Sequence, residues 1–102
     1  SEPLVRGLLR LDIGMHEASF GERPVQLTAI EFAMLKTLMA AGGRVLNRDQ
    51  IMQAAYPGNI HVSDRTIDSH VRNLRGKLKD AGCEDGVETV QGGGLRIGRG
   101  GA

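Results

Sequence analysis

The chain has 102 residues, of which 40% are hydrophobic and 25% charged, with a formal net charge of +1, so it is long enough for one domain with a modest core and is not typical of a disordered segment. The single cysteine, Cys83, excludes an internal disulfide and a cysteine-based metal cage, and it agrees with a reducing cytoplasmic location. No apolar run is long enough to cross a membrane, and we expect neither a membrane span nor a secretory leader.

The N-terminal quarter of the chain shows the alternation typical of short strands. Leu9, Leu11 and Ile13 are separated by polar residues, which is a period of two. Two further short runs flank Gly21-Glu22-Arg23, which has the composition of a hairpin turn. We therefore expect a small antiparallel sheet with one buried face.

A first helix is expected to begin at Thr28. Thr28 and Glu31 have the spacing of a capping box, in which each side chain satisfies an amide at the helix start. Gly42-Gly43 marks the end of this helix. Apolar residues at helical spacing predict its buried face: Phe32, Leu35, Leu38 and Met39.

A second helix is expected to begin near Asn47, with Gln50 in a similar cap. Pro57-Gly58-Asn59 ends it and opens a loop. The predicted inward-facing residues are Ile51, Ala54 and Ala55.

A third helix is expected from Ser63 or Asp64 to Asp80, and either of the first two residues can cap it. Its predicted apolar stripe consists of Ile67, Val71, Leu74 and Leu78. The residues expected on its far side are polar, cationic or small: Arg65, Ser69, Arg72, Asn73 and Gly76. Such a helix can anchor itself to a core and lie against a phosphate-lined groove.

The end of the chain is predicted to form a hairpin. Residues 87–90 and 95–97 have strand composition, and the glycines at 92–94 form a tight turn between them. Sheet, three helices and hairpin, in this order, predict an α+β winged helix-turn-helix in which the hairpin is the wing.

Positive charge is concentrated on the third predicted helix. Residues 1–62 carry six basic and six acidic residues, whereas residues 65–79 carry five basic residues and only Asp68 as an acid. A local cationic field is expected for a surface that docks on nucleic acid. The alternative is an ordinary surface helix whose Lys77 and Lys79 complement the helix dipole without any ligand.

Three separated segments resemble the effector domain of OmpR/PhoB-type response regulators. LTAIEFAMLKTLMAAGGRVLNRDQI resembles the family's first two helices, DRTIDSHVRNLRGKL its third helix, and ETVQGGGLRI its C-terminal hairpin. The resemblance covers roughly residues 8–97, and the segments follow one another in order at compatible spacing. It implies that helix 64–80 enters a DNA major groove and that wing 87–97 lies near the adjacent minor groove.

The resemblance also implies residue roles. Basic positions of the third helix would contact phosphates, Asn73 would read a base, and Tyr56 would lie near the DNA backbone. Asparagine can bond adenine in a bidentate way, so its chemistry suits base reading. The DNA-contacting residues predicted in this way are Arg48, Tyr56, Arg65, Thr66, Ser69, His70, Arg72, Asn73, Arg75, Lys77, Gln91 and Arg96.

The chain departs from the family pattern at three positions. Gln91 replaces a residue that is usually basic, and Leu95 replaces one that is often tyrosine, so both changes are expected to remove a DNA contact from the wing. Gly76 replaces a commonly charged residue, and we interpret it as tolerated drift, although a close approach of backbone to DNA is the alternative.

The family implies a longer protein and several partners. Residues 1–102 are expected to be one domain with an ordered core at about 5–98 and a frayed glycine-rich tail, and Ser1 in place of methionine suggests an excised fragment. The phosphorylated receiver domain, through which a sensor kinase acts, is absent from this chain. Loop 56–62 corresponds to a segment that touches RNA polymerase in some members. Two copies are expected on repeated half-sites of double-stranded DNA, where they can form a dimer.

Catalytic and metal-binding hypotheses have little support. Asp68, Ser69 and His70 are consecutive on a helix, so their side chains diverge and cannot form a hydrolytic triad. His16, His61 and His70 lack the spacing of a helical zinc site. We expect no enzyme activity, metal or cofactor, and we expect Cys83 to be a loop or packing residue.

Two hypotheses on local and global function remain open. Asp68 and Arg72 are one helical turn apart and are expected to form a modest surface pair. The rival to DNA binding is a winged-helix protein-interaction module whose basic face meets an acidic partner.

Overall fold

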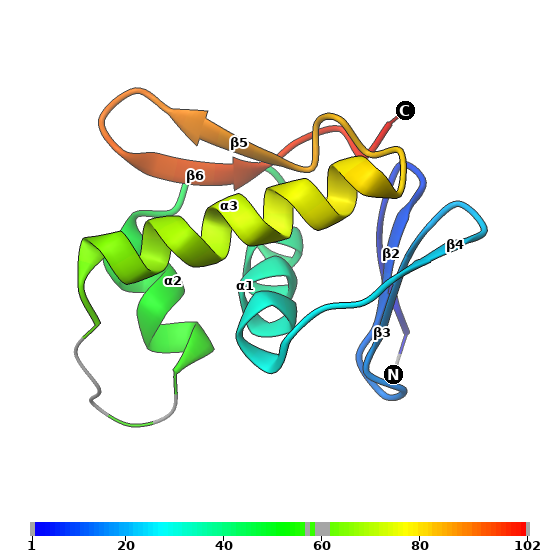
Figure 1. The fold of residues 1–102 in the computed structure, drawn as a ribbon, viewed down its shortest axis with the longest axis horizontal. Coiled ribbons are helices and arrows are strands. Elements are labelled where there is room, and N and C mark those ends of the chain that lie inside the picture. Colours follow the sequence, from blue (N-terminus) through cyan, green and yellow to red (C-terminus); the bar gives the residue numbers. More distant parts are fainter. Residues whose placement is uncertain (1, 57, 59–61, 102) are drawn as a thin grey trace.

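The computed structural model describes residues 2–56, 58 and 62–101 and confirms the predicted winged helix (Figure 1). The strands of the N-terminal sheet are β1 (Leu4–Arg6), β2 (Leu9–Asp12), β3 (Glu17–Phe20) and β4 (Arg23–Val25). The helices are α1 (Ala29–Ala40), α2 (Arg48–Ala55) and α3 (Asp64–Asp80), and the hairpin strands are β5 (Val87–Val90) and β6 (Gly94–Ile97).

The N-terminal sheet is antiparallel throughout, in the order β1-β2-β3-β4. Its inner face is built around Leu9 and Leu11, which are both fully buried, while the intervening Arg10 is exposed. The alternation predicted at these residues is therefore confirmed. Ile13 lies in the turn after β2 instead of continuing the strand, because the chain reverses there to pair Asp12 with Glu17.

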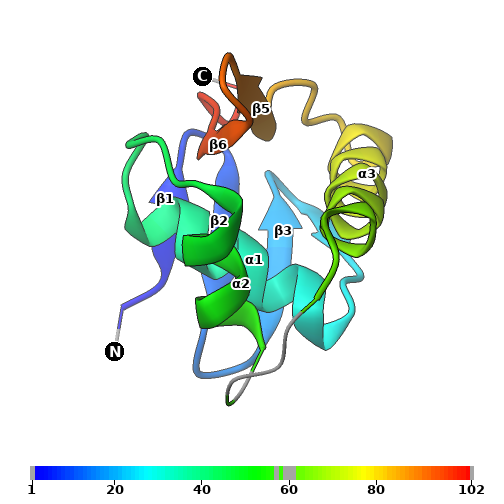
Figure 2. The same cartoon turned by 90° about the vertical axis from the view of Figure 1, so that its left-hand side faces the viewer.

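Helix α1 is the centre of the core. It lies between the sheet on one side and α2 and α3 on the other, and its end also contacts β6 (Figure 2). The predicted capping box of Thr28 and Glu31 is present. The predicted inner face is buried as expected, but Met34, on another side of the helix, is also fully buried. A helix that is covered on several sides has no single apolar stripe, which is why periodicity missed Met34.

Helix α2 begins with the predicted capping box of Asn47 and Gln50. Ile51 and Ala55 are buried as expected, but Ala54 is exposed, so that prediction was wrong. Met52 takes its place in the core. Alanine is compatible with either environment, and only the packing against α1 decides which side of this short helix turns inward.

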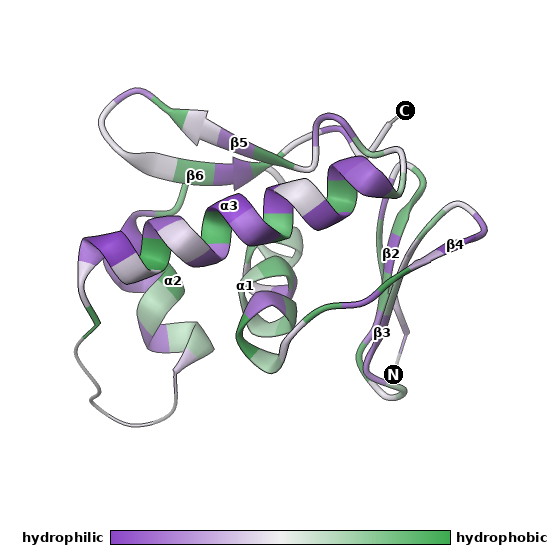
Figure 3. Ribbon diagram, viewed as in Figure 1, coloured by the Kyte–Doolittle hydropathy of each residue, from purple (hydrophilic) through white to green (hydrophobic). Residues whose placement is uncertain are grey.

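Helix α3 runs across the molecule beneath the hairpin, and its hydropathy alternates along its length (Figure 3). The Ser63 side chain caps it by accepting a hydrogen bond from the Thr66 amide. The predicted apolar stripe is confirmed, with Leu74 and Leu78 fully buried.

The inner strand of the hairpin, β6, is part of the core. Leu46, in the segment before α2, exchanges two backbone hydrogen bonds of 2.8 Å with Leu95 of β6. Leu95 is 2% exposed and Ile97 is 1% exposed. The wing is therefore fastened to the helical unit along its inner edge, and only its turn projects.

The glycine-rich tail is docked on the sheet, contrary to the frayed end that we expected. The Leu8 amide donates to the Gly100 carbonyl at 2.9 Å, and the Arg6 Nε donates to the Gly98 carbonyl at 2.9 Å. Gly100 has a φ of +70°, and a Cβ there would collide with the Arg6 carbonyl. Glycine in this tail thus permits close packing and does not imply disorder.

Candidate nucleic-acid interface

The outer face of α3 consists of Arg65, Ser69, Arg72, Asn73 and Gly76, and all five residues are exposed. Within the described residues, the side chains of Arg65, Ser69, Arg72 and Asn73 form no hydrogen bond or ion pair. Two guanidinium groups, a hydroxyl and an amide are therefore available to an external ligand on one side of a rigid helix. We call this surface the outer face.

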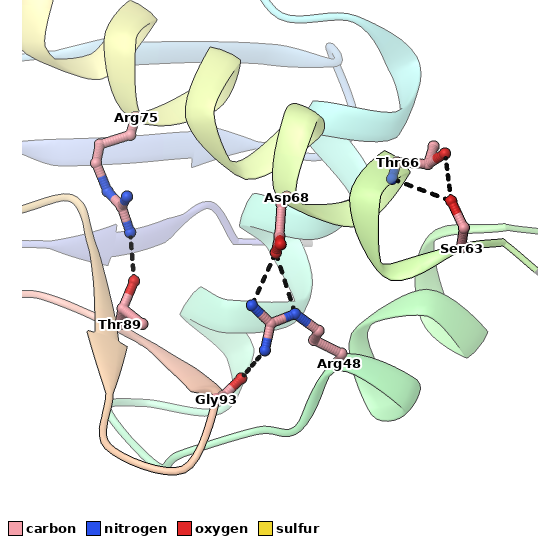
Figure 4. A network of polar contacts seen from close by, with 7 residues as sticks. All are labelled: Arg48, Ser63, Thr66, Asp68, Arg75, Thr89 and Gly93. Carbon is pink, nitrogen blue, oxygen red and sulfur yellow. Dashed lines mark hydrogen bonds and ion pairs between the residues drawn. The ribbon is translucent and has the colours of Figure 1, made fainter.

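The flank of α3 nearer the hairpin is bonded to β5. Arg75 Nε donates to the Val87 carbonyl at 3.1 Å. Its Nη2 donates to Thr89 Oγ1 at 2.9 Å (Figure 4). Both bonds fix the C-terminal half of α3 against β5. Arg75, which was predicted to contact phosphate, thus already has two partners within the fold.

Asp68 lies two turns before Arg75 on the same flank, and its partner is Arg48 of α2. Arg48 Nη2 and Nε donate to Asp68 Oδ1 at 2.7 and 3.1 Å, and Arg48 Nη1 donates to the Gly93 carbonyl at 2.6 Å (Figure 4). The predicted pair of Asp68 and Arg72 was therefore wrong. The helical spacing permits that pair, but Arg48 offers two donors to the same oxygen from a neighbouring helix.

The opposite flank of α3 is bonded to α1 and to the end of α2. His70 Nε2 lies 2.6 Å from the Tyr56 hydroxyl, and Lys77 Nζ lies 2.6 Å from Glu31 Oε1. Two residues predicted to contact DNA, Tyr56 and His70, are thus brought together by the fold. Lys77 instead stabilises the folded protein, because its ammonium neutralises the carboxylate of Glu31, which is only 2% exposed.

The sequence predicts only one of the two contacts of the buried Glu31 carboxyl. Burial raises the pKa of its carboxyl, but hydrogen bonds from Lys77 and Thr28 and the Lys77 charge together lower the pKa below its usual value. The capping box revealed its bond to Thr28. No pattern in the sequence connects it with Lys77, which lies 46 residues away.

The wing presents few side chains to a ligand. Gln91 is exposed at the turn, and Arg96 is ion-paired with Glu88 at 3.0 Å. Arg96 faces away from the side of the hairpin on which Leu95 is buried. The expectation that Leu95 removes a DNA contact needs correction, because this position points into the core and offers no side chain to a groove.

Other candidate chemistries find no support in the described residues. No group of three histidine, cysteine or acidic side chains in this part of the chain could hold a metal ion. Asp68 and His70 turn towards different elements, to Arg48 and Tyr56. His16 stacks on Phe32 with ring centroids 3.8 Å apart. His61 lies outside the described residues.

Cys83 is buried, as expected for a packing residue. Burial and the nearby Asp85 charge raise the pKa of its thiol, so the unreactive protonated form is favoured.

Two observations concern the rest of the molecule. A cavity of about 700 Å³ lies beside β2, β3 and the start of α1, and neither α3 nor the wing lines it. None of the helices in the described ranges has the length and apolar character needed to cross a membrane.

Comparison with known proteins places these features in context. The family model described as "Transcriptional regulatory protein, C terminal" matches residues 21–97. The phosphate regulon transcriptional regulatory protein PhoB of Escherichia coli (strain K12) is 38% identical over 89 residues, which are 87% of this chain and 39% of that protein. The chain thus spans about two fifths of the length of this curated relative.

Two solved structures have a similar fold. The Klebsiella pneumoniae RstA DNA-binding domain, in complex with the RstA box, superposes with a TM-score of 0.81 at 25% identity and covers 97% of this chain and 99% of its own. The DNA-binding domain of CpxR from E. coli gives a TM-score of 0.79 at 33% identity and covers 95% of this chain and 96% of its own.

Proposed function

This chain belongs to the family of C-terminal domains of transcriptional regulatory proteins, and from this we propose that it binds duplex DNA with sequence preference as the effector domain of a response regulator. In this proposal α3 lies in the major groove and the turn between β5 and β6 lies near the adjacent minor groove. The relative solved with the RstA box supports it, because that domain shares this fold over nearly its whole length.

The observation that carries the proposal is the outer face of α3. Arg65 and Arg72 extend from it without partners among the described residues, and they lie two turns apart on the same side of the helix, so they suit phosphate oxygens along one edge of a groove. Such contacts release counterions and supply affinity, but they carry no sequence information.

Sequence preference is assigned to Asn73 and Ser69 on the same face. The Asn73 amide offers a donor and an acceptor, which match N7 and N6 of adenine in the major groove. The stripe on the far side of α3 is buried, so these side chains are presented by a helix that cannot roll. Thr66 and Gln91 are candidates for additional contacts with the DNA backbone.

The basic residues that are already bonded within the fold have a positioning role in this proposal. Arg75, His70 and Lys77 hold α3 against the wing and the core through bonds of 3.1 Å or less. A helix fixed on both flanks loses little conformational freedom on binding, which favours affinity. These residues orient the outer face even where they do not touch DNA.

The remaining partners are proposals that the family suggests. Two copies would occupy repeated half-sites, a receiver domain outside this chain would receive the signal from a sensor kinase, and the protein would act in the cytoplasm. The segment expected to touch RNA polymerase, loop 56–62, includes residues 57 and 59–61, which lie outside the described residues, so this stays a prediction.

The experiment that tests the proposal is selection of duplexes from a randomised library, followed by fluorescence anisotropy at two salt concentrations. We expect enrichment of a defined motif whose preference persists at the higher salt. The control is the double variant R65A/R72A, which should lose most affinity for selected and random duplexes alike. Binding that vanishes with salt and enriches no motif would overturn the proposal and favour the protein-interaction module.

A further inference from the structure

Arg48 joins α2, α3 and the turn of the wing. Its backbone belongs to the first turn of α2, two of its nitrogens bond Asp68 of α3, and the third bonds the carbonyl of Gly93 in the wing turn (Figure 4). All three guanidinium nitrogens are therefore occupied. The group was predicted to contact DNA, yet its geometry is that of an internal clamp.

The clamp acts on the tip of the wing, which is the turn at 91–93. The two strands are held separately, β6 by the backbone bonds of Leu46 and Leu95 and β5 by Arg75. Among the described residues, Arg48 supplies the side-chain bond that ties the turn at 91–93 to the helices. Removing it should loosen the tip while the strands β5 and β6 stay in place.

The surroundings of Gly93 fit this arrangement. Gly93 has a φ of +89°, and a Cβ there would lie 2.7 Å from Arg48 Nη1. Glycine thus provides both the turn conformation and the room for the guanidinium to reach the carbonyl.

We propose that Arg48 is a positioning residue that sets the place of the wing tip relative to the outer face of α3, instead of binding a phosphate. The effect of Arg48 on DNA binding rests on the proposed function, because the distance between the groove contacts of α3 and of the wing would depend on this one side chain. The effect of Arg48 on the mobility of the wing does not rest on DNA binding.

The first test measures the wing without DNA. In ¹⁵N NMR relaxation of the R48Q variant, we expect the amides of Gly92 and Gly93 to gain fast motion, with lower heteronuclear NOE values, while the Leu95 amide stays as in the wild type. Unchanged Gly92 and Gly93 amides would overturn the proposal. This arm remains valid even if the wild-type protein selects no duplex, so the two proposals can fail separately.

The second test asks whether replacing Asp68 raises or lowers the affinity for the selected duplex. If Arg48 is a clamp, D68N and R48Q each weaken binding, by roughly five- to tenfold, and the double variant is no weaker than either single one. If Arg48 binds phosphate, D68N strengthens binding, because it releases the guanidinium and removes a negative charge. That result would overturn the proposal.

Two further variants separate geometry from charge. D80N makes the same charge change at the exposed end of α3 and should not weaken binding. R48K keeps the positive charge but cannot bond Asp68 and Gly93 with a planar fork, so it should behave like R48Q. A lysine variant with wild-type affinity and a rigid wing turn would contradict the clamp.

Discussion

The outer face and the two flanks of α3 carry the same kinds of side chain but differ in what those side chains bond. On the outer face, Arg65 and Arg72 have no partner within the described residues. On the flanks, Arg75 bonds β5 and Lys77 bonds buried Glu31. Counting positive charge along residues 65–79 therefore overstates the DNA-binding surface, because part of that charge holds the helix in place.

The difference between the outer face and the flanks of α3 is tested most strongly at Lys77. K77M removes the cation from a carboxylate that is 2% exposed, and losing a hydrogen bond to a charged group costs about 1.5–3 kcal/mol of unfolding free energy. Urea denaturation followed by circular dichroism measures this loss. The matched control is K79M in the same helical turn, where an exposed lysine should change stability by less than about 0.5 kcal/mol. Equal losses in the two variants would mean that the flank and the exposed surface do not differ.

The same contact should be visible in the pH dependence of stability. The pKa of Glu31 is lower in the folded protein than its usual value, so the unfolded chain binds the proton more readily than the native state. The contribution of the Glu31 carboxylate to the free energy of unfolding is therefore fully present above its pKa in the unfolded chain. It is lost as the pH falls through the lower pKa of the folded protein. We expect E31Q to flatten part of the fall in unfolding free energy between about pH 5 and pH 2. An unchanged slope in E31Q would show that other carboxyl groups account for it.

On the outer face, the largest effect is expected at Asn73. N73A should cost about 1–3 kcal/mol of binding free energy for the selected duplex. It should cost little for duplexes in which the base pair that Asn73 contacts has been changed. Binding of a panel of single-base-pair variants by anisotropy measures the difference. The control is S69A, whose smaller side chain should change the preference less. A uniform loss across the panel would make Asn73 a positioning residue or a phosphate ligand.

Local structure was predictable from the sequence because its causes are local. Both capping boxes join residues three positions apart, and the stripe of α3 follows from helical periodicity. Pairing between elements was not predictable in this way. Asp68 was assigned to Arg72 because that partner is near in sequence, whereas its partner in the fold, Arg48, is 20 residues away.

The same limit explains which site residues were correctly located and which were not. Exposure of the outer face followed from the stripe opposite to it. The engagement of Arg75 and Lys77 depends on where β5 and α1 lie, and periodicity along α3 contains no information about either. Leu95 shows the converse error: the resemblance made its position one where a DNA contact is lost, whereas the strand that pairs with Leu46 directs its side chain into the core.

Gly76 lies in the middle of the outer face and allows the two interpretations of this glycine to be separated. A Cβ at this position would meet no atom within 4 Å, so G76A should stabilise the protein by about 1 kcal/mol through helix propensity. Drift predicts unchanged DNA affinity, whereas close approach of backbone to DNA predicts weaker binding. Thermal unfolding and anisotropy on the same preparation measure both quantities. Greater stability with weaker binding would contradict drift.

The smallest effect is expected for a single phosphate contact on the outer face. R72A should weaken binding to selected and random duplexes alike and lower the salt slope by about 0.9, which is roughly a threefold difference between 50 and 200 mM salt. Anisotropy titrations at four salt concentrations resolve such a slope. R23A makes the same charge change at an exposed position in β4, so its slope should remain that of the wild type. Similar slopes for R72A and R23A would mean that only the net charge of the domain matters, and that the outer face of α3 is no closer to phosphate than the sheet.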